Sequence, residues 1–265
     1  MQAMIFAAGL GTRLKPYTEQ HPKALIPVCG IPILQRVIKN IAAAGVEHIV
    51  INVHHFADQI ENFLKANHNF GVDISVSDER ALLLDTGGGL LQAAPLFSAL
   101  NHDEPVLLHN ADILTDLPIS QIFKQHTISG ADVTLLCSHR NSSRTLWFDK
   151  DDRLCGWENS NTHEYRPSGF SPSPCMHPSP FDGIHVVSPK IFPLLSDYNT
   201  QTATGEQHTS DGIHPFSIVP FYLANLSKLN IRRFLLPEMY SWFDIGSTTK
   251  LAAAEAAMHD RLLTH

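Results

Sequence analysis

The 265-residue sequence lacks the features that mark several common classes of protein. Its four cysteines form no C-x-x-C pair, and a chain of this length needs no disulfides to fold, so a reduced, cytoplasmic setting is expected. The 16 histidines include no H-E-x-x-H pair, and their scattered positions do not indicate zinc. Residues 1–8 lack the basic segment of a signal peptide, and Gly or Pro interrupts the longest apolar runs, so we expect neither a membrane span nor a membrane partner.

Positive charge is scarce as well. The chain has 19 Lys and Arg residues against 26 Asp and Glu residues, which gives a formal net charge of -7. A general nucleic-acid binder would show a basic face, so that class is excluded. An apolar content of 43% is enough for a full core and excludes wholesale disorder. The length suits one large domain, and the sequence carries no signal for an oligomeric state.

The first half of the chain alternates between two apolar patterns. Buried strands are predicted at residues 2–8, 46–53, 72–76 and 105–109. Helical periodicity predicts helices at residues 33–44, 57–66 and 85–97. Gly45 follows the first of these helices, as a C-terminal glycine should. The alternation predicts an α/β fold with helices on both faces of the sheet, and ligands of such sheets bind at the carboxyl ends of the strands.

The second half of the chain is more mixed. Strands are predicted at residues 131–138, 181–187 and 230–235, with a hairpin formed by residues 145–149 and 154–158. Helices are predicted at residues 189–195, 216–226 and 247–259, the last with Ser247 as its N-cap. Residues 159–180 are rich in Ser, Pro and His and are predicted to form a flexible loop. Because no internal repeat is present, we expect a single domain over residues 1–265.

The loop after the first predicted strand carries the first chemical signal. It reads Gly9-Leu10-Gly11-Thr12-Arg13, and Leu14 stands where a dinucleotide-binding G-x-G-x-x-G motif needs its third glycine. The G-x-x-x-x-G-K-[ST] phosphate loop is absent too. Glycines let backbone N–H groups approach a phosphate closely, and Arg13 and Lys23 would add positive charge. The alternative is an ordinary strand-to-helix turn with surface cations.

Together with the residues that follow, this loop resembles a family signature. Residues 7–18 (AAGLGTRLKPYT) and 22–28 (PKALIPV) are similar to the GxGTRLxPLT and PKxLxPV motifs of the sugar-1-phosphate nucleotidyltransferases, with Tyr17 where Leu is usual. Five further segments resemble motifs of this family in the same order: residues 30–34 (G-x-P-[IL]-[IL]), 85–89 (ETGGG), 110–112 (NGD), 181–184 (F-[ST]-G-I) and 242–246 (W-x-D-x-G). The resemblance covers residues 1 to about 260. It implies a three-layer α/β/α, Rossmann-like nucleotidyltransferase fold with a mixed, mostly parallel central sheet.

The resemblance also implies a reaction, the transfer of a nucleoside monophosphate from a nucleoside triphosphate to a sugar 1-phosphate with release of pyrophosphate. The implied catalytic residues are Arg13, Lys23, Asp112 and Asp244. The two aspartates would hold Mg²⁺, which prefers one or two carboxylates together with phosphate oxygens. Taken singly, each aspartate could instead form an Asx-turn or a helix cap. The implied nucleotide-binding residues are Ala8, Gly9, Leu10, Gly11, Thr12, Arg13, Lys23, Asn52, Thr86, Gly87, Gly88 and Asn110.

The base and the sugar should contact different parts of the chain. Gly87 and Gly88 would let the base ring approach the backbone, the alternative being a helix N-terminus with a loose glycine loop. Sugar contacts are implied for Glu158, Asp182 and Gly183. Members of the family often follow the acidic residue with a lysine, whereas this chain has Asn159, a departure that bears on Glu158. Residues 1–130 would thus form the nucleotide-binding half and residues 131–265 the sugar-binding half.

Several substrates are compatible with these motifs. The short chain and the DTGGG run most resemble the N-acetylmuramate-1-phosphate uridylyltransferases and then the mannose-1-phosphate guanylyltransferases. The expected partners are therefore a nucleoside triphosphate (UTP, GTP or CTP) and a sugar 1-phosphate, and the glycine run favours a pyrimidine base. The related phosphocholine cytidylyltransferases remain an alternative. So does a catalytically silent nucleotide-sugar sensor, which would have lost a metal carboxylate or Lys23, although this chain keeps both.

Overall fold

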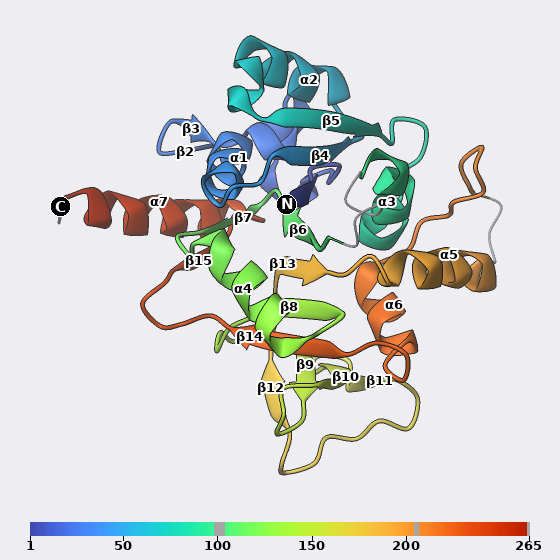
Figure 1. The fold of residues 1–265 in the computed structure, drawn as a ribbon. Helices are drawn as coiled ribbons and strands as arrows, with labels where there is room; N and C mark the ends of the chain where they lie inside the picture. Colours follow the sequence, from blue (N-terminus) through green and yellow to red (C-terminus); the bar gives the residue numbers. More distant parts are fainter. Residues whose placement is uncertain (98–103, 204–206, 264–265) are drawn as a thin grey trace.

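A seven-stranded mixed sheet forms the centre of the protein (Figure 1). The structure is a computed structural model that describes residues 1–97, 104–203 and 207–263, with side chains as far as Met258. The strands of this sheet are β1 (Gln2–Phe6), β4 (His48–Val53), β5 (Asp73–Asp78), β6 (Val106–Asn110), β8 (Val133–Cys137), β13 (Phe181–Val187) and β14 (Ile231–Leu235). Their spatial order is β14-β8-β13-β6-β1-β4-β5, and only β13 runs antiparallel to its neighbours within this sheet. The expected mixed, mostly parallel sheet is confirmed.

Helices cover both faces of this sheet, so the three-layer α/β/α prediction is also confirmed. One face carries α1 (Ile33–Ala43), α2 (Ala57–Ala66), α4 (Ile119–Ser129) and α7 (Thr248–Leu263), and the other carries α3 (Asp85–Ala93), α5 (Ile191–Thr202) and α6 (Ile218–Ala224). Successive side chains of a strand point to opposite faces. In β1, Ala3 and Ile5 accordingly pack in the core on the α1 side of the sheet, and Met4 packs in the core on the α3 side. All three are fully buried.

Local hydrogen bonds explain where the elements end. Strand β1 stops two residues before the predicted end because the Ala7 N–H donates to Asn52 Oδ1 at 2.7 Å instead of to a neighbouring strand. Helix α3 stops at Ala93, ahead of a 3₁₀ turn that contains Pro95, whereas the predicted helix extends to residue 97. Proline has no N–H for the helical ladder. Helix α7 begins where predicted, with Ser247 Oγ accepting from the Lys250 N–H at 3.4 Å.

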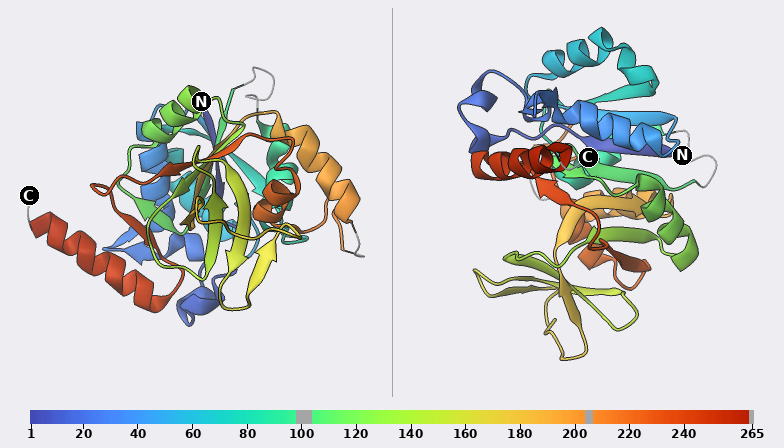
Figure 2. Two further views of the ribbon diagram at one scale, coloured as in Figure 1. Left: turned by 90° about the horizontal axis from the view of Figure 1, so that it is seen from below. Right: turned by 90° about the vertical axis from the view of Figure 1, so that its left-hand side faces the viewer.

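A four-stranded sheet lies apart from the central sheet (Figure 2, right). Its strands, in the order β11-β10-β9-β12, are β9 (Arg144–Phe148), β10 (Leu154–Asn159), β11 (Glu164–Arg166) and β12 (His177–Ser179). The predicted hairpin is confirmed in β9 and β10. Residues 159–180 are not wholly a loop, because they supply β11 and β12, one on each edge of that hairpin. The open edges of a hairpin can pair with short segments through backbone groups even when those segments have few apolar residues. Pro178 is tolerated in β12 because β12 is an edge strand.

Two further pairs of strands shape the edge of the sheet where the parallel strands end. Strands β2 (Pro27–Val28) and β3 (Ile31–Pro32) form a small antiparallel pair before α1. Strand β7 (Ile113–Thr115), which follows β6 directly, pairs with β15 (Trp242–Asp244) near the other end of the chain. This second pairing brings the carboxy-terminal segment beside the end of β6.

Candidate active site

The loop that follows β1 is held in a conformation that only its second glycine allows. Gly11 has a left-handed backbone with φ of +63°, and a Cβ there would lie 2.9 Å from Thr18 Cγ2 and 3.0 Å from Lys23 Cβ. Thr18 Oγ1 donates to the Gly11 carbonyl at 2.9 Å and so fixes the loop from the inside. The absence of a side chain at Gly11 therefore brings Lys23 against the loop, as the predicted site requires.

The same loop presents unpaired donors. Within the described chain, the backbone N–H groups of Ala8, Gly9, Leu10 and Gly11 donate to no other residue. Gly9 and Leu10 are exposed, and so is Arg13, which follows at the start of a 3₁₀ turn. Successive free N–H groups with a nearby guanidinium form a cradle that suits phosphate oxygens.

The two predicted catalytic aspartates lie next to each other. Asp112 follows the end of β6, and Asp244 ends β15, where it stands opposite Ile113 in the β7–β15 pair. The Ile245 N–H donates to the Asp112 carbonyl at 2.8 Å. The structure thus brings together two residues that are 132 positions apart in the chain.

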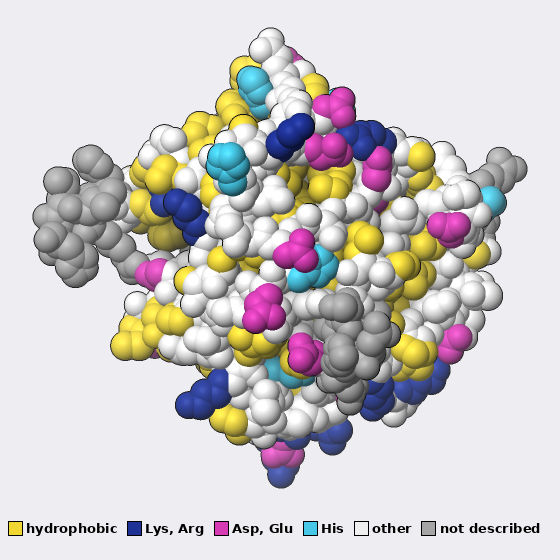
Figure 3. Space-filling model, turned by 45° about the horizontal axis from the view of Figure 1, so that its top comes forward, with side chains coloured by type: hydrophobic (Ala, Val, Ile, Leu, Met, Phe, Trp, Pro, Cys, Tyr) yellow, Lys and Arg dark blue, Asp and Glu magenta, His cyan; other side chains and the backbone are white. Residues whose placement is uncertain are grey.

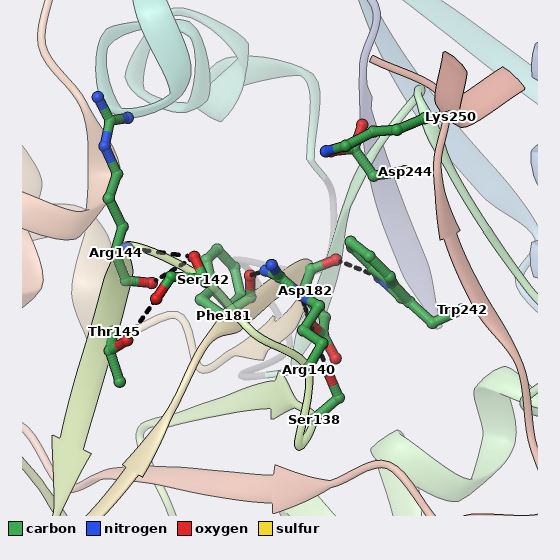
Figure 4. Close-up of polar contacts among 10 residues, drawn as sticks. All are labelled: Ser138, Arg140, Ser142, Arg144, Thr145, Phe181, Asp182, Trp242, Asp244 and Lys250. Carbon is green, nitrogen blue, oxygen red and sulfur yellow. Dashed lines mark hydrogen bonds and ion pairs between the residues drawn. The ribbon is translucent and has the colours of Figure 1, made fainter. Parts of the chain in front are cut away.

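Each aspartate forms an ion pair with a lysine. Lys23 pairs with Asp112, and Lys250, in the first turn of α7, pairs with Asp244 (Figure 4). Burial opposes ionisation of Asp244, but the hydrogen bond and charge of Lys250, the Gly246 N–H and the charge of Lys23 outweigh it and lower its pKa. The carboxylate of Asp244 is therefore ionised at neutral pH.

The donor set fits a magnesium ion. Two adjacent carboxylates, completed by the phosphate oxygens of a ligand, are the hard oxygen donors that Mg²⁺ prefers. Arg13 lies at the same place, because a Cβ built on Gly246 would be only 3.0 Å from Arg13 Nη2. All four predicted catalytic residues consequently surround one point at the carboxyl edge of the sheet.

A cavity of about 450 Å³ opens beside this point. Seven predicted residues line it: Ala8, Gly9, Lys23, Asn52, Thr86, Asn110 and Asp112. Asp85, the first residue of the 85–89 motif, also lines it, and so do Glu79 and Pro215, which the sequence analysis did not single out. A larger cavity of about 710 Å³ lies between α1, β7 and α7, but none of the predicted site residues line it.

Asn52 and Glu79 form a buried polar pair at the cavity wall. Asn52 Nδ2 donates to Glu79 Oε1 at 2.7 Å, and the Leu84 N–H donates to Glu79 Oε2 at 3.0 Å. Each side chain is only 2% exposed, and burial raises the pKa of the Glu79 carboxyl. Because Asn52 Oδ1 holds the Ala7 N–H, Asn52 links the glycine loop to Glu79. Glu79 lies three residues after the predicted strand at 72–76 and directly after β5, between two other charged residues, Asp78 and Arg80.

Gly87 and Gly88 do not face the cavity in the way the sequence analysis predicts. Both are buried, and both N–H groups donate to the Phe216 carbonyl, at 2.8 and 3.2 Å. A Cβ on Gly87 would lie 2.5 Å from Phe216 Cδ2, and one on Gly88 would lie 2.8 Å from the His214 carbonyl oxygen. The missing side chains therefore admit the segment before α6, and neither glycine lines the 450 Å³ cavity, so base contacts by Gly87 and Gly88 stay a prediction.

None of the three predicted sugar-binding residues lines the 450 Å³ cavity. Glu158 lies in the four-stranded sheet, where Trp147 Nε1 donates to it at 3.0 Å, and it does not line the 450 Å³ cavity. Gly183 has φ of +76°, and the space above it is filled by Asn110, whose Nδ2 would lie 2.7 Å from a Cβ. Asp182 is 0% exposed, so its carboxylate cannot contact a sugar directly. Its partner is Arg140, which the sequence analysis missed (Figure 4).

The surface agrees with the charge analysis. On the face shown in Figure 3, described Lys and Arg side chains are scattered among Asp and Glu side chains and form no continuous basic surface. Among the described residues, no helix has the length and apolar character that crossing a membrane requires.

The fold and the cavity define an α/β protein with a phosphate cradle and paired carboxylates at the carboxyl edge of its sheet. Comparison with known proteins gives the same answer. A model of the family described as nucleotidyl transferase matches residues 2–146. The chain is 30% identical to the N-acetylmuramate alpha-1-phosphate uridylyltransferase of Caulobacter vibrioides over 264 residues, which cover 97% of this chain and 96% of the relative.

Two other matches are less extensive or less similar in sequence. The mannose-1-phosphate guanylyltransferase catalytic subunit beta of Danio rerio is 33% identical over 137 residues, 51% of this chain and 37% of that protein. A solved UDP-glucose pyrophosphorylase in complex with UDP-glucose shares the fold with a TM-score of 0.73 at 18% identity, covering 98% of both chains. The chain therefore belongs to the nucleotidyl transferase family, and within it to the sugar-1-phosphate nucleotidyltransferases.

Proposed function

We propose that this protein is a Mg²⁺-dependent uridylyltransferase that joins UMP from UTP to a sugar 1-phosphate. The observation that carries the proposal is the convergence of Asp112 and Asp244, each paired with a lysine, beside the free N–H groups of residues 8–11. The relative that matches over almost its whole length is a uridylyltransferase, whereas the guanylyltransferase matches only half of this chain. This difference supports UTP over GTP and makes N-acetylmuramate 1-phosphate the first sugar to test.

The proposed reaction requires the protein to align its substrates and to neutralise their charge, and it requires no nucleophilic side chain. An oxygen of the sugar phosphate attacks the α-phosphorus of UTP, the bond to the oxygen that bridges to the β-phosphate breaks, and pyrophosphate leaves with that oxygen. The attacking phosphate is already anionic, so catalysis consists of alignment and charge neutralisation.

The residues of the site suit these tasks. The N–H groups of residues 8–11 and the guanidinium of Arg13 would bind the β- and γ-phosphates, and Lys23 would contact the α-phosphate. Asp112 and Asp244 would hold Mg²⁺, which when bound neutralises phosphate charge and polarises the reacting phosphorus. Pro215 alone among the described cavity residues comes from residues 131–265, which supports residues 1–130 as the nucleotide-binding half.

The test is a substrate matrix. The purified protein is incubated with UTP, CTP, GTP or ATP, Mg²⁺ and a panel of sugar 1-phosphates that includes N-acetylmuramate 1-phosphate, and pyrophosphate release is followed. We expect the fastest release with UTP, its loss on chelation by EDTA, and its return when Mg²⁺ is added. Release with CTP and phosphocholine alone would favour the cytidylyltransferase alternative, and nucleotide binding without any release would favour the sensor.

A variant tests the site itself. Asp112→Asn keeps the size of the side chain but removes a metal-binding charge, so turnover should fall at least about a hundredfold with the fold retained. Asp73→Asn is the matched control, because it removes an exposed carboxylate from the start of β5 and should leave turnover unchanged. Full activity in the Asp112 variant would refute the assignment of the metal site.

A further inference from the structure

Arg140 is held in place by β13, the strand next to β8 in the central sheet. It lies just after β8, with 31% of its side chain exposed. Its Nε donates to Asp182 Oδ1 at 2.9 Å, and its Nη2 donates to the Phe181 carbonyl at 2.8 Å (Figure 4). Two bonds from a rigid, planar guanidinium to one strand leave this group little freedom to rotate.

The partner of Arg140 is a buried carboxylate, Asp182. Asp182 also accepts from Ser138 Oγ at 3.0 Å, while its Oδ2 is buried and has no partner among the described residues. The motif that residues 181–184 resemble carries serine or threonine at this position. Burial raises the pKa of Asp182 to about 6, against the opposing effect of Arg140. An ionised carboxylate at this depth requires a paired cation, so Asp182 and Arg140 depend on each other.

The guanidinium also lies against Trp242. Its Cζ is 4.5 Å from the centre of the indole ring, within the range of a cation–π contact. The indole N–H donates to the Asp182 carbonyl at 2.9 Å, so Trp242 is fixed on its face by Arg140 and at its edge by β13 (Figure 4). The Trp242 side chain is thus held by two contacts, one at its ring face and one at its indole N–H.

Trp242 begins β15, and Asp244 ends it. Residues two apart in a strand share a face, so the place of the tryptophan sets the place of the aspartate. Strand β15 has three residues and pairs only with β7 within the described chain. A two-stranded pair of this length is marginal without external anchors. Trp242 provides one of them, beside Phe243, which packs against the core.

We propose that Arg140 is a positioning residue, whose guanidinium, fixed by Asp182 and stacked on Trp242, holds β15 so that Asp244 meets Asp112 at the cation site. This inference rests on the proposed function only for the identity of the cation. It assigns a role to a residue that contacts no reacting atom.

The experiment measures metal binding as well as activity. Mn²⁺ accepts the same oxygen ligands as Mg²⁺, and its binding to the protein alone is followed by the electron paramagnetic resonance of the free ion. In Arg140→Ala we expect the dissociation constant for Mn²⁺, and the Mg²⁺ concentration for half-maximal activity, to rise about tenfold, the effect of removing an outer partner of a metal ligand.

A second variant separates positioning from folding. Arg140→Ala alone leaves the Asp182 charge uncompensated and lowers the thermal midpoint. The double variant Arg140→Ala/Asp182→Ser removes both charges and places at 182 the hydroxyl residue of the related motif. We expect it to recover most of the thermal midpoint while its Mn²⁺ binding stays weak, because Trp242 still lacks the guanidinium. A double variant that recovers stability and Mn²⁺ binding together would overturn the proposal.

A matched control is built into the four-stranded sheet. Arg166 lies over Trp157 at 5.2 Å and pairs with Glu164 at 2.7 Å, the same kind of contact on a strand that leads to no aspartate. Arg166→Ala should leave the Mn²⁺ dissociation constant within about twofold of the parent value. An unchanged constant in a folded Arg140→Ala would refute the positioning role. A parent protein that binds Mn²⁺ yet releases no pyrophosphate with any substrate pair would refute the proposed function alone.

Discussion

A buried imidazole whose ring nitrogens have no hydrogen-bond partner among the described residues contributes to the pH dependence of this protein's stability, and one substitution should remove that contribution. His185, in β13, is 1% exposed and lies between the rings of Phe181 and Tyr222, at 5.1 and 5.8 Å between centroids. Neither ring nitrogen has a partner among the described residues. Burial, with a smaller effect of His109, lowers the pKa of His185 from 6.5 to about 3. The perturbation is His185→Leu, which keeps a similar volume and removes the titration.

The size of the effect follows from the difference between the folded and unfolded states. At about pH 5 the unfolded chain protonates this histidine and the folded chain does not, which favours unfolding by about 2 kcal/mol, whereas at about pH 7 the same contribution is roughly 0.2 kcal/mol. For a histidine whose folded pKa is lowered, stability is full above the unfolded pKa and is lost as the pH falls. The drop in unfolding free energy between these two pH values should therefore be smaller in the variant by about 2 kcal/mol.

The assay is urea unfolding of the parent and the variant at both pH values, followed by circular dichroism. Any change in packing caused by leucine is present at both pH values and cancels in the comparison. His139→Leu, which replaces an exposed histidine, is the control and should keep the drop of the parent protein. If His185→Leu shows the same drop as the parent, within about 0.5 kcal/mol, then the folded protein protonates His185 and the reasoning fails.

Three further substitutions test the packing and the glycine loop. Tyr222→Phe removes a buried hydroxyl that has no partner among the described residues, so the unfolding free energy should rise by about 1 kcal/mol, and a loss would show that the hydroxyl is bonded. Gly87→Ala places a Cβ 2.5 Å from the Phe216 ring and should cost about 1 to 3 kcal/mol in the same assay. Gly9→Ala, where no atom lies within 4 Å of the added Cβ, should leave stability unchanged but weaken binding of a nucleoside triphosphate, and equal losses in both glycine variants would contradict this account.

The parts of the site that sequence could predict are those carried by local patterns. Glycines directly after a buried strand predict a loop at the carboxyl edge of a parallel sheet, and the structure has Gly11 there with a left-handed backbone. The helices at residues 33–44 and 57–66 follow from apolar periodicity and are confirmed in α1 and α2. The adjacency of Asp112 and Asp244 came from the family resemblance, because no local pattern relates residues so far apart.

The parts that could not be predicted depend on contacts across the chain. Glycine at 87 and 88 can admit either a ligand or a neighbouring segment, and the sequence does not distinguish these uses, so the occupant, Phe216, emerges only from the fold. Asp182 was expected at the sugar, but a single acidic residue between apolar neighbours carries no mark of burial. Its partner, Arg140, lies 42 residues earlier in the loop after β8, so the pairing depends on the order of β8 and β13 in the sheet.

Lys23 and Lys250 offset the charge repulsion between Asp112 and Asp244. Adjacent carboxylates repel each other, and this repulsion opposes holding both of them in the ionised form at one site. Lys23 on Asp112 and Lys250 on Asp244 supply one positive charge for each negative charge, which offsets this repulsion, and Lys250 contributes to the lowered pKa of Asp244. A divalent cation has the charge of both ammonium groups, so its binding would free Lys23 and Lys250 to contact phosphate oxygens. The net charge of -7 for the whole chain is thus compatible with an anionic substrate, because the charges at the site are balanced in pairs.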